Sequence, residues 1–112
     1  MREIQDLLRA LGVTRTYKGY TRLLSAVSLA LEDESRLEEI KHEIYERVAA
    51  ISGCEWTTVE RSIRTAVLRA WEKNRTLLMS IAGYPLDAPP TASEFVEMLV
   101  MYVRHHALAG EK

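Results

Sequence analysis

The sequence predicts an all-α protein, a compact bundle of about six helices that forms a single domain over residues 1–112. Apolar residues recur at helical spacing in one segment after another, and no stretch of any length alternates as a β-strand does. Glutamate follows Ser35, Thr57 and Thr91 by three residues, a spacing typical of helix N-termini. A chain of 112 residues with 47% hydrophobic residues suits one domain with a single core.

Two helices are expected before residue 32. In the first, one face is formed by Ile4, Leu7, Leu8 and Leu11, and Gly12 suits the C-terminal cap. The second helix is entered through residues 18–20. It repeats the apolar pattern with Leu23, Leu24, Val27 and Leu31.

A third helix is expected to start at Ser35, because Ser35 and Glu38 have the spacing of a capping box. It would carry Leu37, Ile40 and Ile44 toward the core. The sequence leaves open whether this helix runs unbroken into Tyr45 or bends there.

Residues 45–64 (YERVAAISGCEWTTVERSIR) are typical of a helix-turn-helix. Ala49 is small where the two helices must cross closely, and Gly53 supplies the turn with a backbone of positive φ. The apolar contacts that hold the two helices together would come from Val48, Cys54 and Val59. The first helix is expected to end near Ser52. The second, the recognition helix, covers about 56–74 and has a capping-box spacing at Thr57 and Glu60.

After this helix, a short helical piece is expected over residues 77–82, followed by a loop that holds all three prolines, 85–90. Thr91 and Glu94 form the third capping-box spacing. The last helix is expected to end near Ala107, and its apolar positions are Phe95, Val96, Leu99 and Val103.

The recognition helix has one apolar face and one polar face. At about 100° per residue, the stripe that faces the core consists of Val59, Ile63, Ala66, Val67 and Ala70. The other side carries the candidate DNA-binding residues Thr57, Thr58, Glu60, Arg61, Arg64 and Thr65. Arginine pairs with guanine O6 and N7, glutamate accepts from cytosine N4, and threonine contacts a thymine methyl group or a phosphate. Exposed arginine and threonine also occur on ordinary surfaces, but the turn motif directly upstream favours DNA binding.

The charge is unevenly distributed, although the formal net charge is only −1. Residues 32–46 contain seven acids against two bases, whereas residues 57–75 contain five bases against two acids, and residues 1–22 also contain five against two. A positive face can therefore exist on a nearly neutral protein. Around the glycine turn at residues 18–20, candidates for flanking phosphate contacts are Arg15, Lys18 and Arg22.

An enzyme is not expected. The adjacent His105 and His106 point about 100° apart on a helix and cannot easily share a metal, and His42 lies apart from them. The sequence has no glycine-rich phosphate loop and no zinc-ligand spacing. We therefore expect no catalytic residue, no metal and no cofactor.

A cytoplasmic protein without a membrane partner is expected. No apolar run approaches the roughly 18 residues that a membrane span needs. Residues 1–12 lack the apolar core of a signal peptide. The single cysteine, Cys54, cannot form an internal disulfide.

Six short segments occur together in a characteristic order: LGV at 11–13, KGY at 18–20, VERSIR at 59–64, AW at 70–71, GY at 83–84 and SEF at 93–95. Between about Ile4 and Arg104 the chain thereby resembles the C-terminal DNA-binding effector domain of the sporulation initiation response regulator family of Firmicutes. The resemblance implies a six-helix domain that binds short operator boxes in double-stranded DNA. It also implies tandem head-to-tail homodimers on adjacent boxes, with the last helix in the dimer contact.

The same resemblance implies roles for particular residues. Glu60, Arg61 and Arg64 would contact bases and backbone, and residues 73–84 would correspond to the region that touches the sigma subunit of RNA polymerase. Two features depart from the family pattern. Residues 73–84 are less polar here, and Thr65 stands where the family tends to have histidine, which would alter operator preference. Family members also carry an N-terminal receiver domain. None is expected here, so the chain would be a fragment or a stand-alone domain without assured phosphorylation control.

The sequence thus favours a sequence-specific DNA-binding transcription regulator. The alternative is an all-α protein-interaction or dimerisation module that does not bind DNA. Its partner or dimer surface would include Leu68 on the recognition helix and Met98, Met101 and Tyr102 on the last helix. Burial of the Arg61 and Arg64 face by a partner, or its pairing with the acids of residues 32–46, would remove the basis of the DNA interpretation.

Overall fold

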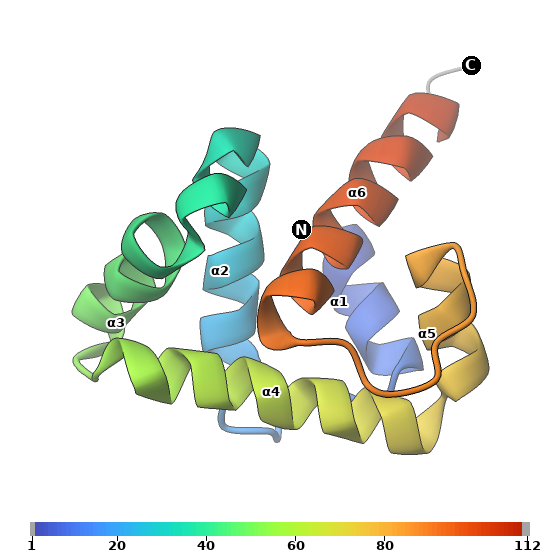
Figure 1. The fold of residues 1–112 in the computed structure, drawn as a ribbon, viewed down its shortest axis with the longest axis horizontal. Helices are drawn as coiled ribbons and strands as arrows, with labels where there is room; N and C mark the ends of the chain where they lie inside the picture. The colour runs from blue at the N-terminus through green and yellow to red at the C-terminus, as the bar shows by residue number, and fades with distance from the viewer. Residues whose placement is uncertain (1, 111–112) are drawn as a thin grey trace.

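A long helix, α4, runs along one side of the molecule, and the other helices stand on it (Figure 1). The computed structural model describes residues 2–110, with side chains as far as residue 106. No strand occurs within these residues, and the all-α prediction is confirmed. The elements in chain order are α1 (Arg2–Ala10), α2 (Tyr20–Glu32), the 3-10 helix η1 (Glu34–Glu39), the π-helix η2 (Lys41–Tyr45), α3 (Glu46–Ser52), α4 (Trp56–Lys73), α5 (Arg75–Ala82) and α6 (Ala92–Gly110).

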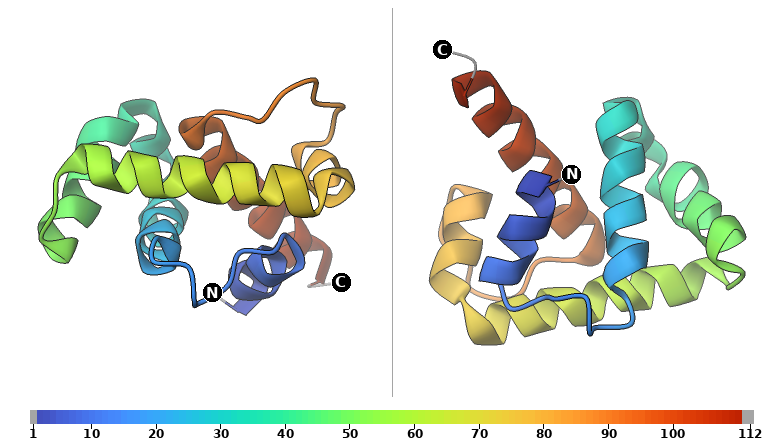
Figure 2. Two further views of the ribbon diagram at one scale, coloured as in Figure 1. Left: turned by 90° about the horizontal axis from the view of Figure 1, so that it is seen from below. Right: turned by 180° about the vertical axis from the view of Figure 1, so that it is seen from behind.

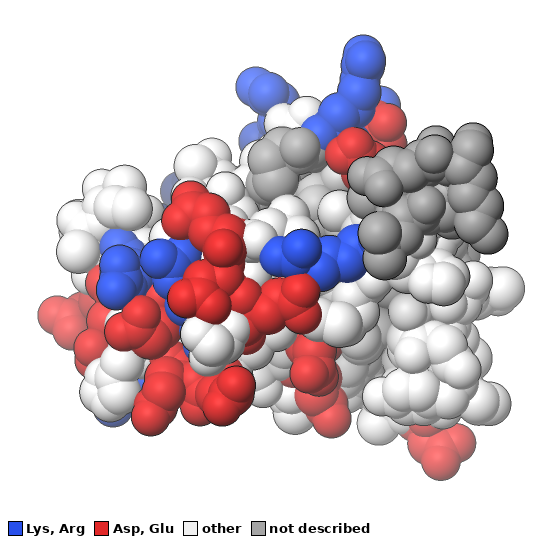
Figure 3. Space-filling view, turned by 90° about the horizontal axis from the view of Figure 1, so that it is seen from above, with Lys and Arg blue, Asp and Glu red and all other residues white. Residues whose placement is uncertain are grey.

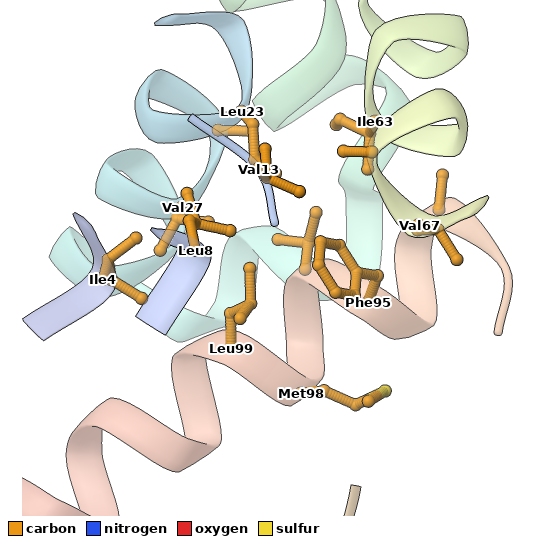
Figure 4. Close-up of a cluster of buried hydrophobic side chains, with 14 of the residues drawn as sticks. Ile4, Leu8, Val13, Leu23, Val27, Ile63, Val67, Phe95, Met98 and Leu99 are labelled. Carbon is orange, nitrogen blue, oxygen red and sulfur yellow. The ribbon is translucent and has the colours of Figure 1, made fainter. Parts of the chain in front are cut away.

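The core lies between α4 and the helices that stand on it. Figure 4 shows side chains of α1, α2, α4 and α6 pointing toward one another, together with Val13 from the loop before α2. The whole predicted core stripe of α4 is buried, including the largest side chain, Ile63 at 0% exposure. Phe95 and Leu99 of α6 fill the centre. The hydrophobic face of each helix therefore follows the periodicity of the sequence.

The predicted start of the third helix is wrong. Asp33, not Ser35, caps the segment: its carboxylate accepts from the Ser35 backbone N–H at 3.0 Å and from the Ser35 hydroxyl at 2.7 Å. The Ser35 hydroxyl donates backward to Asp33. The chain then forms η1 and η2 before regular α-helix resumes at Glu46. The open question at Tyr45 is answered by this change of helix type, because π-helical and 3-10 turns interrupt the α-helical repeat.

The other predicted helix starts had mixed outcomes. The box at Thr91 and Glu94 is confirmed, with the Glu94 carboxylate 2.8 Å from the Thr91 N–H and the Thr91 hydroxyl 3.1 Å from the Glu94 N–H. The box at Thr57 and Glu60 is wrong, because α4 already begins at Trp56 and places Thr57 inside the helix. α5 starts two residues before the predicted 77, because the Asn74 side chain accepts from the Leu77 N–H at 3.1 Å. α6 extends to Gly110, beyond the predicted end near Ala107.

Candidate nucleic-acid interface

The turn between α3 and α4 has the geometry expected from its glycine. Gly53 ends α3 in the left-handed conformation, with φ 70° and ψ 40°. The Cys54 N–H returns to the Ala49 carbonyl at 3.0 Å, which closes the end of α3. Ala49 is only 5% exposed and Val48 is fully buried. The small side chain and the left-handed turn together let α3 cross the start of α4 closely.

The outward side of α4 carries a continuous stripe of exposed side chains. Arg61, Arg64, Thr65 and Leu68 are all exposed, at the i, i+3, i+4 and i+7 spacing of one helix face. Seen from below (Figure 2, left), the loop of residues 11–19 lies along one side of α4 and the loop of residues 83–91 along the other. The stripe therefore lies between two loops that could follow a ligand on either side.

The two predicted base-reading arginines differ in their partners. Arg64 forms an ion pair with Glu60 at 2.7 Å, one turn earlier on the same helix. Arg61 has no hydrogen-bond or ion-pair partner among the described residues. Neither arginine pairs there with the acids of residues 32–46. Among the described residues, therefore, the acids of residues 32–46 do not occupy the arginine face.

The loop before α2 is tied to the flank of α4 by hydrogen bonds to a single residue. The Tyr17 hydroxyl donates to the Ser62 carbonyl, and the Arg22 guanidinium donates to the Ser62 hydroxyl at 3.0 Å. The Ser62 hydroxyl donates in turn to the Thr58 carbonyl at 2.9 Å. Burial raises the pKa of Tyr17. Gly19 is needed here for close approach, because a Cβ at that position would lie 2.6 Å from the Tyr17 hydroxyl oxygen.

The predicted phosphate contacts in this loop are thus placed differently from one another. Arg15 and Lys18 are exposed and have no partner among the described residues. Arg22 is half-buried, and its guanidinium is engaged by Ser62. Tyr17 and Ser62 were not predicted from the sequence. Ser62 could have been noticed as a polar residue on the buried side of α4, since it lies three residues after Val59 and four before Ala66.

The N-terminus of α4 rests on an aromatic stack. The rings of Trp56 and Tyr45 are parallel within 3°, with centroids 6.5 Å apart, and the Lys41 ammonium lies 4.7 Å from the centroid of the Trp56 ring. Thr57 is exposed and Thr58 is half-buried in the same turn. Because no side chain caps α4, the Trp56 and Thr57 N–H groups are open to an external acceptor, whereas the Thr58 N–H already donates to a backbone carbonyl.

Tyr45 is nearly inaccessible at 3% exposure, and its hydroxyl has no hydrogen-bond partner among the described residues. Burial, and then the nearby Glu60 carboxylate, raise the pKa of Tyr45 to about 12. A buried hydroxyl without a partner costs stability, so Tyr45 contributes through its ring rather than through its oxygen.

Many acidic side chains lie on the side of the molecule opposite to α4. Figure 3 views the molecule from the side opposite to α4 and shows acidic side chains crowded over the region of η1 and η2. The acids of residues 32–46 belong to this region. Separation of this acidic side from the basic helix is what a nearly neutral DNA-binding protein needs.

The predicted partner surface is only partly exposed. Leu68 is 46% exposed and Met101 is 41% exposed. Tyr102 is half-buried, and its ring stacks on His106 with centroids 3.8 Å apart. Met98 differs from the expectation: it is buried, at 8% exposure, because α6 is surrounded by α1, α2, α4 and α5.

No group of three or more histidine, cysteine, aspartate or glutamate side chains that could hold a metal ion occurs among the described residues. Within the same part of the chain, no helix is both long enough and apolar enough to span a bilayer. A family model described as sporulation initiation factor Spo0A C terminal matches residues 4–103 of the 112-residue chain.

Proposed function

The chain belongs to the family of the sporulation initiation factor Spo0A C-terminal domain, a DNA-binding regulatory domain and not a catalytic one, and from this premise we propose that it is a sequence-specific transcription regulator. In this proposal α4 enters the major groove and α3 crosses the DNA backbone. The observation that carries it is the exposed stripe of Arg61, Arg64 and Thr65 on the outward side of α4.

Two arginines supply the base contacts in this proposal. Arg61 is free to form a bidentate pair with a guanine, and Arg64 does the same from a position restrained by Glu60. An exposed ion pair within a helix adds only about 0.3–0.5 kcal/mol to stability. Its value here is orientation: Glu60 holds the Arg64 guanidinium, or accepts from a cytosine N4 itself. Thr65 lies beside them and is available to a thymine methyl group or a phosphate.

Phosphate contacts surround this centre. One stretch of the DNA backbone would be held at the start of α4, by Thr57, Thr58 and the open backbone N–H groups. Arg15 and Lys18 would hold a second stretch from the loop beside α4. Arg22 donates one hydrogen bond to Ser62 and so supports that loop, which leaves only part of its guanidinium for a phosphate.

Two further partners belong to the proposal and rest on the family. Two copies would bind adjacent boxes as a homodimer, with Met101 and Tyr102 of α6 as the exposed or half-exposed candidates for contact between copies. Residues 73–84 would touch the RNA polymerase sigma subunit. In this chain that stretch covers α5 and includes the exposed Arg75, whose guanidinium lies 4.0 Å from the centroid of the Trp71 ring.

The proposal is tested by fluorescence anisotropy with the whole chain, a tandem operator of the family type and a scrambled duplex, at two salt concentrations. We expect preference for the operator, weaker binding at higher salt, and cooperative binding to two boxes compared with one. Arg64→Ala should cost about 1–3 kcal/mol on the operator and relax discrimination at one base pair. Arg2→Ala removes an exposed arginine on α1 and is the matched control. It should change neither the affinity for the operator nor the discrimination between base pairs.

Two results would contradict the proposal. Equal and negligible binding to both duplexes would favour the protein-interaction module, and sedimentation analysis would then show whether the chain self-associates. If Arg64→Ala weakens binding to the scrambled duplex as much as to the operator, Arg64 is a phosphate contact and not a base reader. Glu60→Gln tests the contribution of the carboxylate: preference for the operator should fall, while binding to the scrambled duplex should rise because a negative charge is removed.

A further inference from the structure

Leu68 is an exposed leucine in the middle of the stripe that the arginines form. It lies seven residues after Arg61, so the two side chains leave α4 within about 20° of each other. It also lies four residues after Arg64 and three after Thr65, and 46% of it is exposed. The structure thus places an apolar side chain among polar ones, on the side of α4 that the proposed function turns toward DNA.

The reach of α4 makes this position relevant to the groove. Leu68 lies about 10 Å beyond Arg61 along the helix axis, a length that corresponds to about three base steps in B-form DNA. Homeodomain recognition helices read bases from four positions with this same i, i+3, i+4, i+7 spacing, because a long helix can follow the groove through several turns. α4 has 18 residues, so its fourth turn, which carries Leu68, can take part in the same way.

The surroundings leave Leu68 open on both flanks. One hollow beside it is lined by Arg64, Val67 and the loop residues Pro89 and Pro90. A second is lined by Thr65, Arg69 and the last two residues of α4. Leu68 borders both hollows, so part of its side chain stays accessible between the loop and the end of α4.

We propose that Leu68 is a specificity-determining residue that selects thymine by packing against its C5 methyl group; this rests on the proposed function. The thymine methyl is the apolar group that base pairs display in the major groove, and apolar side chains recognise it by contact. A leucine at a phosphate would gain nothing from its position. The selected base pair would lie about three steps from the one that Arg61 reads.

The experiment begins with the whole chain and a pool of randomised duplexes, from which the preferred site is selected. Each thymine of that site is then replaced singly by deoxyuridine, which pairs identically but lacks the methyl group. We expect one replacement to weaken binding of the wild type about fourfold, the effect of losing one buried methyl group. Leu68→Ala should bind the thymine and deoxyuridine duplexes equally at that position. Leu68→Met, which keeps an apolar contact, should retain most of the discrimination.

Control variants distinguish the role of Leu68 from the proposed DNA-binding function itself. Met101→Ala removes a methionine of similar exposure, 41%, on α6 and should leave the discrimination intact. Arg64→Ala should weaken binding yet keep the methyl effect. A site that is selected and bound by the wild type, but with no methyl effect that depends on Leu68, overturns this inference and leaves DNA recognition standing. Failure to select any site overturns both. If Leu68→Ala instead abolishes cooperativity on tandem boxes without changing thymine discrimination, Leu68 contacts a second copy and the inference is wrong.

Discussion

The Tyr17 hydroxyl donates a hydrogen bond to the backbone carbonyl of Ser62, which joins the loop before α2 to the middle of α4. Arg22 donates to the hydroxyl of the same serine. The Arg69 guanidinium lies 5.3 Å from the centroid of the Tyr17 ring and adds a cation–π contact. Through these contacts the position of Arg15 and Lys18 relative to the recognition helix is fixed by the interior of the protein, before any DNA is present.

Removal of the two tyrosine hydroxyls should have opposite effects on stability. Tyr17→Phe deletes a hydrogen bond and should lower the free energy of unfolding by about 1 kcal/mol. Tyr45→Phe deletes a buried hydroxyl that has no partner among the described residues and should raise it by up to about 1 kcal/mol. Urea unfolding of the two variants and the wild type measures both effects. Equal destabilisation by both changes would show that the Tyr45 oxygen has a partner in solution.

The stability of the wild type should fall at high pH relative to Tyr45→Phe. The pKa of Tyr45 is about 12 in the folded protein, above its ordinary value near 10, because burial disfavours the phenolate. The raised pKa therefore contributes fully to the free energy of unfolding below pH 10. This contribution is lost as the pH rises from 10 through 12, and the loss is about 1 kcal/mol near pH 11. Urea unfolding at about pH 8 and pH 11 measures the change. Parallel loss in both proteins would contradict the assignment to Tyr45.

Lys18→Ala should weaken binding to every duplex by a similar factor, because a phosphate contact carries no sequence information. The slope of log affinity against log salt should also fall by about 1. Anisotropy titrations over a series of salt concentrations measure both quantities, with Arg2→Ala as the control. An unchanged slope would remove Lys18 from the interface.

Alanine at Gly53 or Gly83 should destabilise the protein by a similar amount. Both glycines have positive φ, 70° and 85°, and a Cβ at either position would meet nothing within 4 Å. The cost is therefore conformational, ~1–2 kcal/mol each. Thermal unfolding measures it. Only Gly53→Ala should also weaken DNA binding, since Gly53 sets α3 against α4. Equal effects of both variants on DNA affinity would show that the turn has no special role.

Much of the fold follows from local patterns in the sequence. The buried faces of α1, α2, α4 and α6 follow from apolar periodicity, because a helix surface repeats every 3.6 residues. The box at Thr91 and Glu94 and the left-handed Gly53 follow from residue types alone. The placement of Arg61 and Arg64 on the outer side of α4 follows from the same periodicity once Ile63 is assigned to the core.

The remainder depends on competition between neighbouring residues or on tertiary contacts. Ser35 has the spacing of a cap, but Asp33 takes that role two residues earlier and captures its hydroxyl. Met98 was assigned to the partner surface of the alternative interaction module, yet it is buried because α6 is enclosed on several sides. The hydrogen bond from Tyr17 to Ser62 joins residues 45 positions apart, and no local pattern specifies which polar groups meet across such a distance.

The acids that crowd over η1 and η2 have a consequence for how the molecule meets DNA. With a formal charge of −1 there is almost no net attraction to a polyanion, but separated charge gives the molecule an electric dipole. The electric field of the duplex exerts a torque on that dipole. The torque turns α4 toward the DNA and the acidic side away from it. Most encounters would therefore begin in the productive orientation, and the wrong face would be rejected before contact.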